Sequence, residues 1–168
     1  VTGPSDWKME YELGVDSLKH FNPLPLLMHI MMEVPALRSM GGQLFTVVSE
    51  LFSNAFEHGV LKLDSSLKSS PSGFAEYYQL RQKRLDELTQ GYVKFNMQHT
   101  SDSGRSGVFT LTIEDSGKGF DYPERFRRDD SVAKNKFSGR GIPLIYSLCH
   151  SLEYQGSGNK VVAEIHWP

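Results

Sequence analysis

The spacing of apolar residues changes near residue 92, and this change limits the fold more than any other feature of the sequence. Before that point apolar residues recur every three or four positions, as over 74–88, which predicts amphipathic helices. After it, four segments alternate apolar and polar residues: 92–97, 108–115, 152–154 and 161–167. Such alternation is typical of antiparallel strands with one face on a core. We therefore expect an α+β fold, a two-layer α/β sandwich whose mixed, mostly antiparallel sheet is covered on one face by helices.

Proline and glycine divide the first half of the chain. A weakly alternating stretch at 8–13 suits an edge strand. Asn22 can begin a helix that Pro35 ends or kinks. We expect Gly41 and Gly42 to separate this helix from the next one.

Loops and domain organisation follow from composition. Residues 62–71 are rich in Ser, Lys and Asp, and 101–107 is expected to form a loose hairpin loop between two strands. No repeat or long linker divides the chain, so we expect one domain over 1–168, with a helical insertion at about 61–90.

Charge and cysteine content exclude several classes of protein. The net charge is -2 and like charges do not form runs, which argues against a nucleic-acid binder. Cys149 is the single cysteine, so an internal disulfide and a cysteine-rich zinc site are excluded. No apolar segment reaches the roughly 18 residues that span a bilayer. We expect a cytoplasmic domain without membrane contact, cut from a longer polypeptide because it begins at Val1 rather than Met.

The stretch 46–59 has two distinct faces if it is a helix. At roughly 100° per residue, the polar residues Glu50, Asn54, Glu57 and His58 fall within a narrow arc. The opposite face carries Leu44, Val48, Leu51, Phe52 and Ala55. An Asn in mid-helix is uncommon, because its short amide competes with the backbone. A solvated amphipathic surface helix would nevertheless give the same pattern, so this stretch alone does not establish a site.

Two glycine pairs occur downstream of that stretch. Asp115 follows a predicted strand and leads into Gly117 and Gly119, whereas Gly139 and Gly141 precede a predicted helix. Each pair alone is a weak signal, since most such pairs form turns. In this order and spacing, the acidic-Asn helix and the two glycine boxes resemble the GHKL ATPase superfamily, which includes gyrase, histidine kinases and MutL.

Within the superfamily, the helix is most similar to that of bacterial anti-sigma-factor serine kinases. Their pattern of Glu, Asn-Ala and His-Gly matches the five residues Glu50, Asn54, Ala55, His58 and Gly59. The resemblance extends from about Gly41 to the C-terminus and implies the Bergerat ATP-binding fold. The insertion looks like that of kinase domains at the end of response-regulator and serine-phosphatase fusions, which implies receiver or phosphatase domains upstream.

The resemblance also implies roles for individual residues. Glu50 would be the catalytic base, and Asn54 would bind ATP through Mg²⁺ as its metal ligand, which suits a cation that takes few protein oxygens. Asp115 would accept a hydrogen bond from adenine, or would merely cap a turn. His58 would contact the nucleotide or be a hydrogen-bonded histidine at a helix end.

The glycine boxes would hold the rest of the nucleotide. Gly117 and Gly119 would lie against it, and Gly139, Arg140 and Gly141 would bind its phosphates at a helix N-terminus. Arg140 facing solvent is an equal alternative. An ATP lid would occupy about 120–138. Where family members commonly carry a Thr that supports the adenine-binding Asp, this chain has Asn159 and Lys160 after Gly158, so no residue is assigned to that role.

The function implied is an ATP-dependent serine kinase or anti-sigma-factor-like regulator. Its partner would be a STAS-type anti-anti-sigma protein, a sigma factor or both, and a homodimer is possible. Two alternatives stay open: a nucleotide-gated protein-binding module without turnover, and the catalytic domain of a histidine kinase. Against the latter, no upstream helix pair carries a phosphoacceptor histidine, because His20 and His29 lie in unsuitable sequence context.

Overall fold

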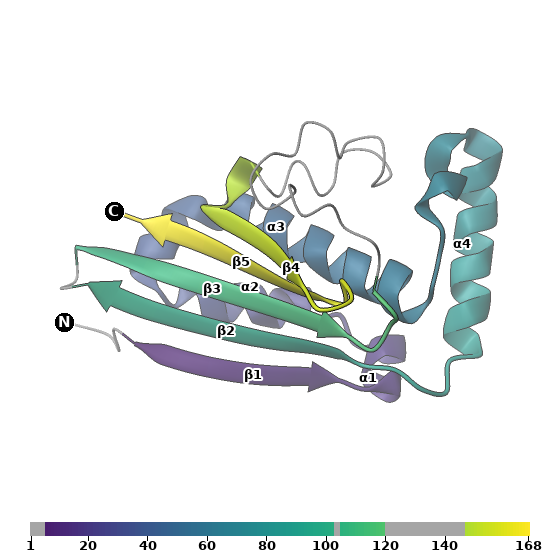
Figure 1. The fold of residues 1–168 in the computed structure, drawn as a ribbon, viewed down its shortest axis with the longest axis horizontal. Coiled ribbons are helices and arrows are strands. Elements are labelled where there is room, and N and C mark those ends of the chain that lie inside the picture. Colours follow the sequence, from purple (N-terminus) through teal and green to yellow (C-terminus); the bar gives the residue numbers. More distant parts are fainter. Residues whose placement is uncertain (1–5, 103–104, 120–146) are drawn as a thin grey trace.

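The chain builds one five-stranded sheet. The computed structural model describes residues 6–102, 105–119 and 147–168. The strands are β1 (Trp7–Leu13), β2 (Val93–Asp102), β3 (Ser106–Asp115), β4 (Ser151–Gln155) and β5 (Lys160–Trp167). Their order across the sheet is β1-β2-β3-β5-β4, and each of these neighbouring pairs is antiparallel. The first and last strands in sequence thus lie apart, and β3 occupies the centre of the sheet (Figure 1).

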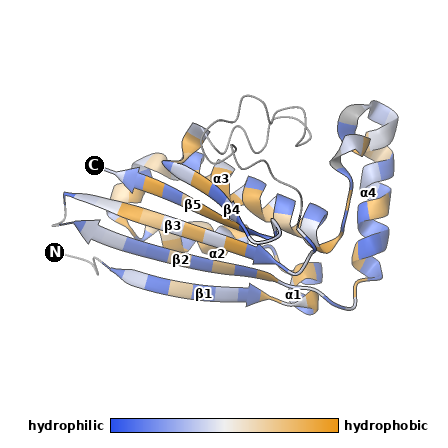
Figure 2. Cartoon of the chain, in the orientation of Figure 1, coloured by the Kyte–Doolittle hydropathy of each residue, from blue (hydrophilic) through white to orange (hydrophobic). Residues whose placement is uncertain are grey.

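Side-chain alternation gives the sheet one apolar face and one polar face. On β3 the residues Phe109, Leu111, Ile113 and Asp115 are all buried, whereas the residues between them are partly exposed. Figure 2 shows the same alternation of hydrophobic and hydrophilic positions along the strands. The predicted one-sided sheet is therefore confirmed.

Helices cover the apolar face. The regular helices are α1 (Val15–His20), α2 (Leu24–Met32), α3 (Gly41–Ser53) and α4 (Pro71–Asp86). The other helical segments have 3-10 or π geometry: η1 (Pro35–Met40), η2 (Asn54–Val60) and η3 (Ser65–Ser69). Figure 1 shows α2 and α3 behind the sheet, whereas α4 stands apart beside the strand ends. The predicted α+β class, with helices on one face, is confirmed.

Local sequence explains where α4 begins. The Ser70 hydroxyl accepts a hydrogen bond of 3.1 Å from the Gly73 backbone N–H, and Pro71 occupies the first helical turn. The carbonyl oxygen of Leu67 lies where a side chain on Gly73 would be, 1.9 Å from an added Cβ. Only glycine therefore allows α4 to pack this closely on η3.

Two predictions about element boundaries are wrong, and one helix was not predicted. Gly41 and Gly42 do not separate two helices, because they form the first turn of α3 after η1. The expected loop at 101–107 is shorter, since β2 runs to Asp102 and β3 begins at Ser106. The short helix α1 was not expected at all.

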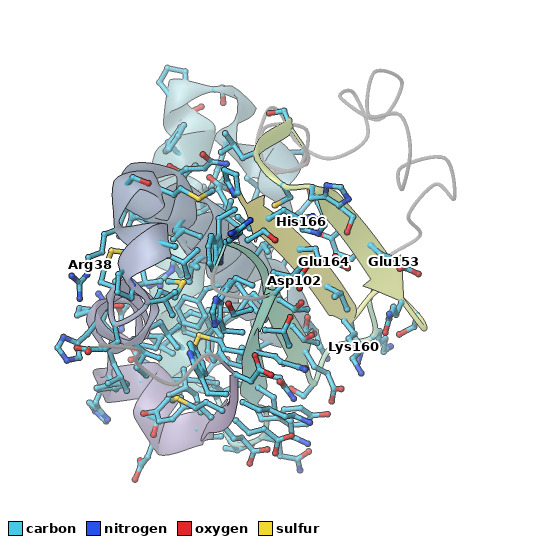
Figure 3. The ribbon with its side chains drawn as sticks, turned by 90° about the vertical axis from the view of Figure 1, so that its left-hand side faces the viewer. Arg38, Asp102, Glu153, Lys160, Glu164 and His166 are labelled. Carbon is cyan, nitrogen blue, oxygen red and sulfur yellow. The ribbon has the colours of Figure 1, made fainter. Side chains whose placement is uncertain are left out.

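The other face of the sheet is polar. Figure 3 shows Glu153, Lys160 and Glu164 on this face, with Arg38 on the helical side of the molecule. In the strand register, Lys160 of β5 lies opposite Glu114 of β3, and Glu164 of β5 lies opposite Ser151 of β4. In the described part of the chain, no helix is both long enough and apolar enough to cross a membrane.

Candidate nucleotide site

The helix that carries the predicted site residues changes its geometry at Asn54. From Gly41 to Ser53 it is an α-helix, and from Asn54 to Val60 it is a π-helix. The Leu61 backbone N–H donates to the Phe56 carbonyl five residues earlier, at 2.9 Å. Single π-turns inside helices are rare and often mark functional sites. The regular helix expected over 46–59 is thus corrected in its second half.

Glu50 and Asn54 lie one turn apart where the two geometries meet. The Asn54 backbone N–H donates to the carbonyls of Glu50 and Leu51, which keeps both side chains on successive turns. Each residue is half-buried. Neither side chain makes a hydrogen bond to any other residue that the structure describes, so both can bind a ligand.

Tyr154 is a buried side chain on which the charges of both Glu50 and Asp115 act. This tyrosine, on β4, is 6% exposed. Its pKa is raised above the ordinary value by burial first, and then by the negative charges of Asp115 and Glu50. Because both carboxylates act on one buried phenol, the structure brings Glu50 and Asp115 to the same region from distant parts of the sequence.

Asp115 is a buried carboxyl group at the end of β3. It is 7% exposed, and the Gly117 backbone N–H donates to its Oδ1 at 2.7 Å. Its pKa is raised to about 6, chiefly by burial and in smaller part by the charge of Glu114, against the lowering effect of the Gly117 hydrogen bond. This bond between neighbours is the turn-capping arrangement considered from sequence, but it uses only one of the two carboxylate oxygens.

Asn159 holds the backbone of Asp115 in place. The Asn159 side-chain Nδ2 donates to the Asp115 backbone carbonyl at 2.9 Å. The backbone carbonyl of Asn159 accepts a hydrogen bond from the Asp115 backbone N–H at 2.8 Å. Sequence reasoning assigned no residue to this support. The signal was the position itself, directly after Gly158 in the last hairpin, where the family commonly has a Thr.

Two glycines allow the backbone to approach Asp115 closely, and a third glycine lies against the last hairpin. A Cβ on Gly59 would lie 2.4 Å from the Asp115 carboxyl carbon, and one on Gly117 would lie 2.4 Å from the Gly59 carbonyl oxygen. Gly119 has a φ of 81°, and a Cβ there would lie 2.1 Å from the Ser157 carbonyl oxygen. Only glycine is tolerated at such positions. The end of η2, the strand end and the last hairpin therefore meet at these residues.

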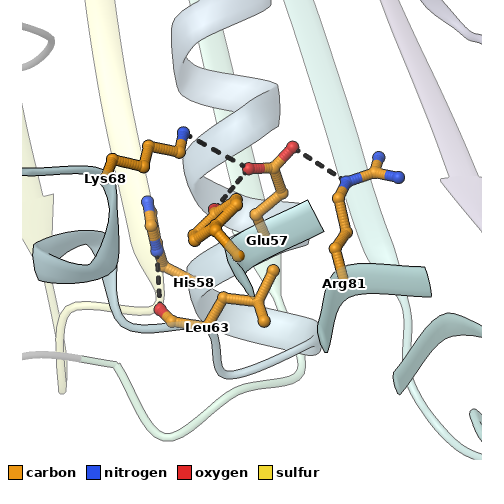
Figure 4. A network of polar contacts seen from close by, with 6 residues as sticks. Glu57, His58, Leu63, Lys68 and Arg81 are labelled. Atoms are coloured by element: carbon orange, nitrogen blue, oxygen red, sulfur yellow. Dashed lines mark hydrogen bonds and ion pairs between the residues drawn. The ribbon is translucent and has the colours of Figure 1, made fainter. Parts of the chain in front are cut away.

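His58 and Glu57 are engaged in contacts on the other side of η2. The Nδ1 atom of His58 lies 2.8 Å from the Leu63 carbonyl oxygen, which is the hydrogen-bonded arrangement considered as the alternative for this residue. Glu57 accepts hydrogen bonds from Tyr77 and Arg81 of α4 (Figure 4). Glu57 is therefore bound by α4, whereas Glu50 and Asn54 make no hydrogen bond to the described residues.

An open groove of about 700 Å³ begins beside Gly59 and Gly117. It lies between the end of η2, the C-terminal part of α4 and the loop before β2. Its lining residues are Gly59, Val60, Leu61, Lys62, Arg84, Glu87, Leu88, Thr89, Gln90, Gly91, Tyr92, Ser116 and Gly117. The groove thus gives a ligand access to the glycine-lined end of the site.

The second glycine box cannot be compared with the structure. Gly139, Arg140, Gly141 and the predicted lid at 120–138 lie outside the described residues. Within the described ranges, no three His, Cys, Asp or Glu side chains are arranged to hold a metal ion. The metal ligand expected from the sequence is the Asn54 side-chain oxygen, a donor type that Mg²⁺ accepts.

Comparison with known proteins identifies the family. Residues 41–165 match the histidine kinase-like ATPase domain family, and this range includes Glu50, Asn54, Asp115 and all the glycines named above. No curated protein matches the chain. The helix with its Glu and Asn, the buried Asp at a strand end and the glycines around it thus agree with the sequence match, and the chain belongs to the histidine kinase-like ATPase domain family.

Proposed function

We propose that this domain binds ATP with Mg²⁺ and transfers the γ-phosphoryl group to a serine of a STAS-type anti-anti-sigma protein. Family membership supports an ATP-binding, kinase-like regulatory domain. The observation that carries the finer proposal is the pair Glu50 and Asn54. Their half-buried side chains, one turn apart, are left without hydrogen bonds in the described structure, and the charge of Glu50 acts together with that of Asp115 on the buried Tyr154.

Asp115 is suited to recognise the adenine amino group. Its carboxylate oxygen Oδ1 is occupied by the Gly117 N–H, which leaves Oδ2 to accept a hydrogen bond from a base. Because Gly59 and Gly117 carry no side chain, no Cβ atom blocks the space next to this carboxylate. Adenine would then lie at the inner end of the groove beside the two glycines.

Asn54 is suited to hold Mg²⁺ together with the phosphates. Magnesium prefers oxygen ligands, retains several waters and needs only one or two protein ligands when phosphates are present. The cation would neutralise the charge that develops on the phosphates. Gly139, Arg140 and Gly141 would contribute backbone N–H groups and a guanidinium at the phosphate end.

Glu50 is suited to act as the base. A serine hydroxyl placed beside it would attack the γ-phosphorus, so that the new O–P bond forms as the bond to the β-phosphate oxygen breaks. Glu50 would accept the serine proton, and ADP would leave with the β-phosphate oxygen carrying negative charge. Without a protein serine, the same arrangement would hydrolyse ATP or would only bind it.

Calorimetry and a transfer assay test the proposal together. We would measure Mg²⁺-dependent ATP binding for the wild type, Asn54→Ala and Asp115→Asn, and phosphate transfer to a STAS protein with and without Glu50→Gln. We expect weaker binding in the first two variants, and loss of transfer with retained binding in Glu50→Gln.

The other outcomes separate the alternatives. Binding without transfer or hydrolysis would favour a nucleotide-gated module that sequesters its partner. Absence of ATP binding by the wild type would refute the assignment of Asp115 and Asn54 altogether.

A further inference from the structure

Glu57 ties the helix of the candidate site to the 61–90 segment. Its carboxylate accepts a hydrogen bond of 2.5 Å from the Tyr77 hydroxyl and one of 3.1 Å from Arg81 Nε, and Lys68 Nζ lies 3.7 Å away. The Glu57 side chain is 13% exposed. Figure 4 shows Lys68 and Arg81 approaching this carboxylate from two sides. A largely buried carboxylate is thus satisfied entirely by the segment that follows it in sequence.

These contacts fall on the π-helical turn itself. The Arg81 guanidinium carbon lies 5.3 Å from the centre of the Phe56 ring, and the His58 ring makes an edge contact with the Tyr77 ring at 6.5 Å. The Glu57 carbonyl accepts a hydrogen bond from the Leu63 N–H at 2.9 Å. Three successive residues of η2 are therefore in contact with α4 or with the loop leading to it.

α4 also fixes the exit from this turn. Arg84 Nη1 donates to the Leu61 carbonyl at 2.9 Å and to the Lys62 carbonyl. Among the described residues, Lys62 is the one non-glycine residue with positive φ, at 56°. Such a conformation is disfavoured for a side-chain-bearing residue and persists where neighbouring contacts hold it. Arg84 supplies one of those contacts.

Hydrogen bonds alone do not explain why the turn is wider than an α-helix. A π-turn replaces regular bonds with a longer ring and is retained where tertiary contacts favour it. In this chain, the tertiary contacts of the turn come from α4 on one side, and the Gly59 backbone lies against Asp115 on the other. A change in the position of α4 would therefore be transmitted to Gly59, and through it to Asp115.

We propose that Glu57 is a positioning residue for the nucleotide site and that the η3–α4 segment controls nucleotide affinity through it. With Tyr77 and Arg81 bound to Glu57, the π-turn keeps Gly59 against Asp115 and keeps Asn54 at the entrance of the turn. Release of Glu57 relaxes the turn and weakens nucleotide binding. The proposal rests on the nucleotide-binding function proposed above.

The exposed side of α4 gives a partner a means of acting on this contact. Tyr78 is 55% exposed and Phe74 is 45% exposed, and their rings stack at 6.1 Å. The Tyr78 ring makes an edge contact with Tyr77 at 5.6 Å. A displacement of Tyr78 would therefore act directly on Tyr77, the tyrosine that is hydrogen-bonded to Glu57.

A set of variants with one matched control tests the proposal. Tyr77→Phe and Glu57→Gln each weaken the contact, and Tyr78→Phe removes a hydroxyl from the neighbouring exposed position. We would measure the dissociation constant of Mg²⁺-ATP by calorimetry, well below the unfolding temperature of each variant. Hydrogen exchange of the backbone amides of 56–59 would be followed in the same samples.

We expect Tyr77→Phe to weaken ATP binding about tenfold and to accelerate exchange at 56–59, because a charge-assisted hydrogen bond is lost. The double variant Glu57→Gln/Tyr77→Phe should bind ATP only slightly less tightly than the single variant with the lower affinity, because both substitutions break the same Tyr77–Glu57 contact. Tyr78→Phe should match the wild type. In addition, Arg81→Lys should retain more affinity than Arg81→Met, which a loss of general packing would not produce.

Two results would overturn the inference, and they are distinguishable. Equal ATP affinity in the wild type, Tyr77→Phe and Glu57→Gln would show that the contact only anchors α4, while the proposed nucleotide site would stand. Failure of the wild type to bind ATP would refute the proposed function and this inference together.

Discussion

The substitution Gly59→Ala tests the packing at the centre of the candidate site. The new Cβ would lie 2.4 Å from Cγ and Oδ1 of Asp115 and 2.7 Å from Oδ2, distances that carbon atoms do not adopt without displacement. Asp115 is 7% exposed and its Oδ1 is bound by the Gly117 N–H, so the carboxylate has little room to move. The substitution must therefore shift either the end of η2 or the Asp115 side chain.

The expected magnitude is the difference of two effects. Inserting a methyl group into a packed site costs about 1–3 kcal/mol, whereas replacing Gly by Ala in a helical segment gains up to about 1 kcal/mol. We expect a net loss of about 1–2 kcal/mol in the free energy of unfolding, measured by urea denaturation. Because the displaced group is the proposed adenine acceptor, ATP affinity measured by calorimetry should fall about tenfold or more.

Gly42→Ala is the matched control for this substitution. Gly42 lies in the first turn of α3, and a Cβ there would meet nothing within 4 Å. It should raise the free energy of unfolding by up to about 1 kcal/mol and leave ATP affinity unchanged. If Gly59→Ala behaves like Gly42→Ala in both measurements, Gly59 does not pack against Asp115 and the account of the site fails.

Two further predictions concern the surroundings of Asp115. Its pKa is about 6 in the folded chain against an ordinary value of 3.8, so between these values the folded chain retains a proton that the unfolded chain releases. This group therefore makes the free energy of unfolding fall as the pH rises from about 4 to 6, and that slope should be absent from a urea titration series on Asp115→Asn. Asn159→Ala should lower the free energy of unfolding by about 1 kcal/mol through loss of the bond to the Asp115 carbonyl, and it should weaken ATP binding in calorimetry. Unchanged values for Asn159→Ala would contradict its supporting role.

Much of the fold follows from the sequence because it depends on local pattern. Alternation at 108–115 and 161–167 predicted strands that the structure confirms as β3 and β5, and the apolar spacing over 74–88 predicted α4. These patterns survive because one face of each element must be buried. By contrast, Gly41 and Gly42 were expected to separate two helices, and they instead form the first turn of α3, where the low helix propensity of glycine does not prevent the helix from beginning.

The site was only partly predictable, because its supporting contacts join distant residues. Asp115 was predicted from its position before two glycines, whereas Asn159 supports it from 44 residues away through a backbone contact that no local pattern encodes. Tyr154 likewise belongs to a short alternating stretch that predicts a buried strand residue and nothing about its neighbours Glu50 and Asp115. Pairing of β5 with β3 and with β4 brings Asn159 and Tyr154 to Asp115, and this pairing depends on register rather than on local sequence. Glu50 comes from α3.

The π-turn changes how the polar residues of this helix are interpreted. In a regular helix, Glu57 would lie seven residues after Glu50, about 20° short of two full turns and hence on the same face. In the structure Glu57 instead meets Tyr77 and Arg81, while Glu50 and Asn54 keep their side chains clear of other described residues. The polar residues of this stretch therefore form two groups with different environments. Glu50 and Asn54 are left available to a ligand, whereas Glu57 is bound by Tyr77 and Arg81 of α4.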